Sequence, residues 1–317
     1  MKGAQTRFYT LDAMRGVAAF LVVLYHANRS VPLGYLAVDL FFSLSGFVLC
    51  AAYLEKLHSG LSFCEFALVR FIRLAPLMIA GAAIGLAING GSLWTLLLVP
   101  TGDLALYPAN IPLWSLLFEL VASLAFAALY RFGKSAWLLL LSFGAAGFLV
   151  GVLSHGSSDL GWGWHTLAPG LARTAFSFCI GVALFAIFRR HPTRDVSWLS
   201  VLAITVPVII MIVPSRMAVY DLAIVAFAFP AIIWLGVRYE VPFARAAAFI
   251  GGSSYALYAI HHPIVRMDLP LWLTIPATVI LAVLLERYYD RPMRTLLTRL
   301  RQVRATASVT ALSGHSA

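Results

Sequence analysis

Long apolar stretches separated by short polar breaks run through almost the whole chain, from Leu11 to Tyr289. A bilayer core about 30 Å thick requires about 20 mostly apolar residues in each helix that crosses it. Cutting the sequence at its polar, proline-rich and glycine-rich breaks predicts ten spans, at residues 10–28, 35–54, 73–89, 112–130, 136–153, 171–188, 197–213, 219–237, 249–267 and 270–288. The predicted fold is all-α, a polytopic integral membrane domain over residues 1–304, followed by a disordered polar tail over residues 305–317.

Composition supports a membrane protein. The chain is 61% hydrophobic and 11% charged, whereas soluble domains are about half apolar and about a quarter charged. The first apolar run carries three polar residues, Asp12, Arg15 and His26, and lacks a small-residue cleavage site, which predicts a first helix rather than a signal peptide. The three cysteines have no paired spacing, so neither a disulfide framework nor a metal site is expected.

The net charge of +10 indicates topology rather than nucleic-acid binding, because the basic residues fall in short clusters between the spans. If the N-terminus is cytoplasmic, eighteen of the 23 basic residues lie in inside segments. Only Arg29, Arg173, Arg216 and Arg266 lie in outside segments or at outer helix ends. The positive-inside rule therefore predicts that both termini are cytoplasmic.

Five ionisable residues lie within the predicted spans, where each costs several kcal/mol unless it pairs or faces a cavity. They are Arg15, His26, Asp39, Glu119 and His261. Arg15 and His26 are eleven positions apart, about 16 Å along a helix, so both can face one interior channel. Asp39 is expected at the depth of His26, where it would orient the imidazole for general-base catalysis. Interhelical hydrogen bonding is the structural alternative, above all for His261, which precedes His262 and Pro263.

Six segments resemble, in the right order, the acyltransferase-3 family of bacterial membrane acyltransferases, which modify surface polysaccharides, lipids and similar acceptors. The opening Leu11–Ala19, with Arg15 and His26 separated by ten residues, resembles its first-helix signature. The others are Val38–Phe47, Arg70–Pro76, Trp114–Glu119, Arg173–Gly181 and Ser254–Pro263, so the resemblance extends from Leu11 to Pro292. No C-terminal hydrolase-like domain, present in some relatives, follows, so transfer is expected from the membrane domain alone or with a separate partner.

The resemblance implies a membrane O-acyltransferase in the bacterial cytoplasmic (inner) membrane. Its donor would be cytoplasmic acyl-CoA, acetyl-CoA by family habit, with no tightly bound cofactor. Its acceptor would be a hydroxyl of a carbohydrate or lipid-linked glycan at the outer side, delivered directly, within a homo-oligomer or by a separate partner.

The resemblance also assigns roles to residues. His26 would be the general base or a transient acyl carrier, and Arg15, Asp39 and Glu119 complete the catalytic set. Arg70 and Arg73, on one helix face, would hold the CoA phosphates, although basic residues at an inner helix end are by default membrane anchors. Substrate-binding or structural roles are predicted for Ser115, Arg173, Tyr255, Tyr258 and His261.

The competing class is a proton-coupled transporter or flippase of a small molecule or lipid-linked glycan, because such carriers also bury a few charges among many helices. A carrier would be expected to show paired broken helices in its two halves, and the sequence shows no such internal symmetry. A purely structural membrane protein would have little need of an intramembrane Arg, His, Asp and Glu set.

Overall fold

The computed structural model describes residues 7–28, 30–215, 217–267 and 269–313. These residues form a helical bundle with one short pair of parallel strands, β1 (Asp195–Val196) and β2 (Tyr239–Glu240). The α-helices are α1 (Tyr9–Asn28), α2 (Ala37–His58), α3 (Phe63–Asn89), α4 (Leu113–Leu129), α5 (Gly133–His155), α6 (Leu167–Phe188), α7 (Ser200–Ile212), α8 (Ala218–Ala223), α9 (Phe229–Arg238), α10 (Ala244–Val265), α11 (Leu271–Leu285) and α12 (Arg291–Ser313). The 3-10 helices are η1 (Gly34–Leu36), η2 (Leu93–Leu97), η3 (Tyr130–Phe132) and η4 (Trp164–Thr166), and π-helical turns are η5 (Ile224–Ala228) and η6 (Glu286–Asp290).

The predicted all-α fold is confirmed, and each of the ten predicted spans falls on a helix or on consecutive helices. The largest boundary error is at α3, which begins at Phe63 rather than at residue 73. Its start is set by a capping box in which the Ser62 hydroxyl accepts from the Glu65 amide (3.2 Å) and the Glu65 carboxylate accepts from the Ser62 amide (3.0 Å). The first turns of α3 therefore lie in sequence that hydropathy had assigned to a loop.

Seven segments of the described chain are long and apolar enough to cross a membrane. They are Tyr9–Ala27, Gly34–His58, Phe63–Asn89, Leu113–His155, Trp164–Phe188, Ala218–Arg238 and Leu271–Val303. Leu113–His155 contains two predicted spans joined by η3, α7 is apolar but only 13 residues long, and α10 is not among the seven. The structure thus supports a multi-pass membrane protein, and ten crossings stay a prediction.

Small residues bring the central helices into close contact. A Cβ atom added to Gly16 on α1 would lie 2.0 Å from the Ile250 side chain on α10, and one added to Gly181 on α6 would lie 2.0 Å from the Ser43 carbonyl on α2. Small residues at helix contacts allow such backbone approach in membrane proteins. The α1–α10 and α2–α6 contacts decide which polar side chains meet in the bundle.

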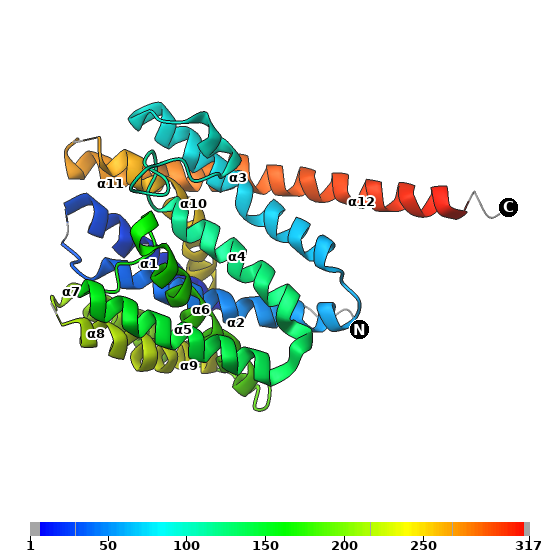
Figure 1. Cartoon of the computed structure of the whole chain (residues 1–317), viewed down its shortest axis with the longest axis horizontal. Helices are drawn as coiled ribbons and strands as arrows, with labels where there is room; N and C mark the ends of the chain where they lie inside the picture. The colour runs from blue at the N-terminus through cyan, green and yellow to red at the C-terminus, as the bar shows by residue number, and fades with distance from the viewer. Residues whose placement is uncertain (1–6, 29, 216, 268, 314–317) are drawn as a thin grey trace.

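The C-terminal helix extends beyond the bundle. Figure 1 shows α12 projecting away from the other helices, continuing the chain from α11 through η6. The structure continues α12 to Ser313, whereas the sequence predicts a tail without structure from residue 305. Residues 314–317 of that tail lie outside the described residues.

Candidate active site

A pocket of about 170 Å³ lies among α1, α2, α3, α4 and α10. Its charged lining consists of Arg15, Arg70, Arg73 and Glu119, one or two from each of three helices. Ser115, Tyr255 and Tyr258 also line it. The structure therefore gathers all the predicted site residues here except His26, Asp39, Arg173 and His261.

Glu119 is held in place by hydrogen bonds and an ion pair. Its carboxylate accepts from the Ser45 hydroxyl at 2.9 Å and from an Arg70 Nη2 at 3.3 Å. Arg70 Nε also donates to the Ser123 hydroxyl at 3.2 Å, and the arginine side chain is only 9% exposed. Arg70 and Glu119 thus largely neutralise each other, since a buried charge requires a partner.

The other two arginines of the pocket make fewer polar contacts than Arg70. Arg73 is 41% exposed, lies 3.7 Å from Asp290 and has its guanidinium 5.5 Å from the centre of the Tyr255 ring. Arg15 lines the same pocket and makes no hydrogen bond or ion pair with any described residue. Three guanidinium groups and one carboxylate leave the pocket with an excess of positive charge, which suits an anionic ligand.

A group of histidines lies next to the Ser115 and Tyr258 side of the pocket. The Ser115 and Tyr258 hydroxyls are hydrogen-bonded at 2.7 Å, and the Tyr258 ring lies 5.6 Å from that of His261. The His26 ring lies 5.1 Å from His261 and 5.0 Å from His262, measured between ring centres. The sequence predicts that His26 and Arg15 can face one channel. In the structure Arg15 lines the pocket, whereas His26 is not in its lining and lies beyond Tyr258.

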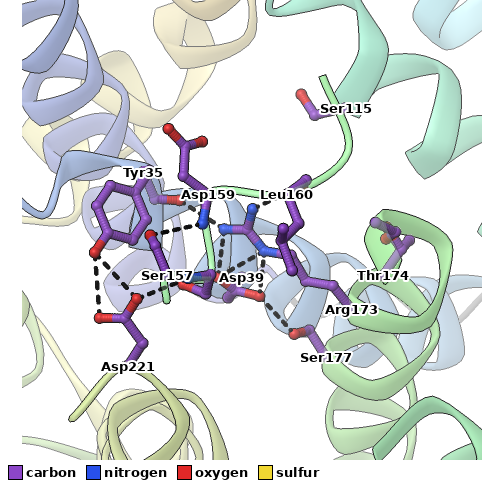
Figure 2. Close-up of polar contacts among 12 residues, drawn as sticks. Tyr35, Asp39, Ser115, Ser157, Asp159, Leu160, Arg173, Thr174, Ser177 and Asp221 are labelled. Carbon is purple, nitrogen blue, oxygen red and sulfur yellow. Dashed lines mark hydrogen bonds and ion pairs between the residues drawn. The ribbon is translucent and has the colours of Figure 1, made fainter. Parts of the chain in front are cut away.

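Asp39 does not pair with His26, and this predicted contact is wrong. Arg173 Nε donates to both Asp39 oxygens at 2.9 and 3.1 Å, and its Nη2 lies 2.6 Å from Oδ2. The Ser177 hydroxyl donates to the same carboxylate at 3.0 Å (Figure 2). The prediction considered depth along α2 but not the direction in which Asp39 points around the helix axis. Asp39 lies on the face of α2 that packs against α6, not on a face toward α1.

The Arg173 guanidinium also binds two backbone carbonyls. Its Nη2 donates to the Tyr35 carbonyl at 2.8 Å and its Nη1 to the Leu160 carbonyl at 3.1 Å (Figure 2). Both Arg173 and Asp39 are fully buried. This arginine therefore joins α6, α2, η1 and the segment between α5 and α6, as a structural residue would.

The segment between α3 and α4 is fixed to the bundle near the histidines. The buried Asn110 amide donates to the Gly81 carbonyl on α3 (2.9 Å) and to the Ala259 carbonyl on α10 (2.8 Å). The Tyr107 hydroxyl donates to the Leu98 carbonyl at 2.5 Å, and burial raises the pKa of Tyr107, which keeps this donor protonated. The Asn110 bonds hold the end of α10 that carries His261 and His262, and the Tyr107 bond joins two parts of the segment itself.

Sequence reasoning missed several residues that contact the predicted ones. Ser45 contacts Glu119, His262 contacts His26, and Asp290 contacts Arg73. His262 could have been found from its place beside His261, whereas nothing in the local pattern distinguishes Ser45 or Asp290. No group of three or more His, Cys, Asp or Glu side chains in the described part of the chain is placed to hold a metal ion.

Comparison with known proteins adds the decisive observation. The sequence model of the acyltransferase-3 family, described as an acyltransferase domain, matches residues 8–285. The chain belongs to the acyltransferase-3 family. It is therefore a multi-pass membrane acyltransferase, and α12 lies outside the matched region.

This acyltransferase also resembles a curated protein over part of its length. It is 49% identical over 83 residues to "Protein 2 in picA locus" from Rhizobium radiobacter. The aligned segment covers 25% of this chain and 44% of that protein, so the match spans less than half of the relative. No solved structure matches the chain.

Proposed function

We propose that the protein transfers an acyl group, most simply acetyl, from cytoplasmic acyl-CoA to a hydroxyl of a carbohydrate or lipid-linked glycan at the outer side of a bacterial inner membrane. The C–S bond of the thioester breaks and an ester C–O bond forms. The hydroxyl proton passes to His26, and the departing CoA thiolate then takes it from the imidazolium. An acyl-histidine formed on the same ring is the second route to this product.

The observation that carries the proposal is the excess positive charge of the pocket. The Tyr258 ring lines this pocket and also lies against His261. Arg73 is the exposed arginine and is suited to bidentate contact with phosphate. Arg70 is occupied by Glu119 and Ser123, so we assign it to fixing the pocket. Arg15, free of ion pairs within the described chain, would attract the donor arm toward the Ser115–Tyr258 end.

Mass spectrometry of surface glycans and lipids from cells with and without this protein tests the proposal. We expect an acyl ester on one glycan or lipid species that disappears when the protein is absent. A species that is missing from the surface, rather than present without its acyl group, would instead indicate the transporter or flippase class.

Replacing Arg73 by Ala is expected to raise the KM for acetyl-CoA by roughly tenfold or more, since a hydrogen bond to a charged group contributes about 1.5–3 kcal/mol. The loss should grow with ionic strength because the remaining contacts are screened. Initial rates against acetyl-CoA concentration measure it, with the exposed Arg190→Ala as the matched control. Equal KM values for the two variants would make Arg73 a topology signal only.

Cysteine labelling tests the proposed orientation. In a background with Cys50, Cys64 and Cys179 replaced by Ser, Arg190→Cys should be protected from an impermeant maleimide in intact cells, and Ser154→Cys should react. Both positions are exposed on the protein surface. The reverse pattern would invert the proposed topology, so that the basic inner loops would face away from the cytoplasmic donor.

A further inference from the structure

His261 has one ring nitrogen whose state is fixed by the backbone. Its Nδ1 lies 2.8 Å from the Tyr258 carbonyl oxygen, which can only accept a hydrogen bond. In a neutral ring Nδ1 therefore carries the proton, and Nε2 is left as a bare acceptor. That Nε2 is fully buried and has no hydrogen-bond partner among the described residues.

The neighbouring group is the His26 ring. The two ring centres are 5.1 Å apart and the planes are inclined by 41°. An N–H···N hydrogen bond of about 3 Å between the edges of two imidazoles sets their centres about 5 Å apart. Because the Tyr258 carbonyl holds the His261 ring, the His26 ring is the one that would turn about its soft terminal torsion to bring a nitrogen toward Nε2.

We infer that His261 Nε2 accepts a hydrogen bond from His26 and so fixes its tautomer, the role that the sequence had predicted for Asp39. The inference rests on the proposed function. With one nitrogen of His26 donating to His261, the other carries no proton in the neutral ring and can take the proton of the acceptor hydroxyl. His261 is thus a positioning residue, and its acceptor also stabilises the His26 imidazolium that forms.

His262 is the competing partner, because its ring centre is 5.0 Å from that of His26 and its Nδ1 is also buried without a partner in the described chain. Its ring stands at 88° to His26, and among the described residues no backbone carbonyl fixes its tautomer in the way Tyr258 fixes that of His261. His262 therefore serves as the matched control.

Two substitutions separate the nitrogens of His261. His261→Asn retains an amide that can donate to the Tyr258 carbonyl, but it has no atom at the Nε2 position. His261→Gln places a carbonyl oxygen, an acceptor, near the Nε2 position. We expect kcat to fall roughly a hundredfold in His261→Asn, with little change in KM for acetyl-CoA, to recover by roughly tenfold in His261→Gln, and to stay near wild type in His262→Asn.

The assay uses detergent-purified protein, with acetyl-CoA as donor and the extracted envelope glycan and lipid fraction of the host as acceptor. Equal kcat values in folded His261→Asn and His261→Gln, or a loss confined to His262→Asn, would overturn the inference. If His261→Asn does not fold, ¹⁵N NMR of histidine-labelled wild type decides: the signal that is lost in His261→Gln must show a protonated Nδ1 and a bare Nε2. If even His26→Ala keeps full activity, the proposed function fails instead.

Discussion

Replacing His26 by Ala is expected to lower acyl transfer by roughly a hundredfold to ten-thousandfold, the range that a general base contributes. The ring lies on α1 against His261 and His262 and is partly exposed, so its loss should leave the bundle folded. The measurement is acyl ester per expressed protein in the surface fraction, by mass spectrometry. The control is His58→Ala, an exposed histidine that is hydrogen-bonded to the Leu54 carbonyl of its own helix and packs against the Tyr130 ring, away from the pocket.

A matched variant separates the base from the donor site. Arg15→Ala should also impair transfer, but mainly at low donor concentration, because Arg15 lines the pocket, whose lining does not include the histidines. Excess acetyl-CoA should therefore restore Arg15→Ala and not His26→Ala. Full acylation by His26→Ala at equal expression would remove this mechanism and favour the transporter class.

Replacing Arg173 by Leu is expected to destabilise the protein by about 3–5 kcal/mol, because it leaves the buried Asp39 carboxylate without its partner. Unfolding of the purified protein in detergent, followed by tryptophan fluorescence against denaturant, measures the change. The double variant Asp39→Leu with Arg173→Leu should recover part of this loss, since no uncompensated charge remains.

The outcome distinguishes a structural ion pair from a catalytic one. Asp39→Asn retains hydrogen bonds to Arg173 and Ser177 but removes the charge, so it should lower stability more than it lowers kcat of the folded fraction. A large kcat loss in Asp39→Asn with unchanged stability would return Asp39 to the catalytic set, against the contacts in Figure 2.

Hydrophobic periodicity was sufficient to predict the helices, and it failed where local chemistry overrode it. The capping box of Ser62 and Glu65 begins α3 in sequence that looks like a loop. The number of crossings is harder, because α7 is short and a 3-10 turn joins α4 to α5. Length and composition alone do not decide how such segments sit in a bilayer.

Spacing predicted depth along a helix but not rotation about it. Arg15, Arg70, Arg73 and Glu119 converge because each charge must face a cavity or a partner. Asp39 was placed at the depth of His26, yet the packing of Gly181 against α2 turns it toward Arg173. Only the helix contacts could show that partner.

Sided membrane vesicles test most directly whether the acyl group passes from a cytoplasmic donor to an outer acceptor through His26. Inverted vesicles from cells that express the protein expose the cytoplasmic face and enclose the acceptor, and right-side-out vesicles do the opposite. Labelled acetyl-CoA added outside should label enclosed glycan or lipid in inverted vesicles of the wild type. Right-side-out vesicles of the wild type, and inverted vesicles with His26→Ala, should show no labelling. Equal labelling in both orientations, or undiminished labelling with His26→Ala, would contradict the account.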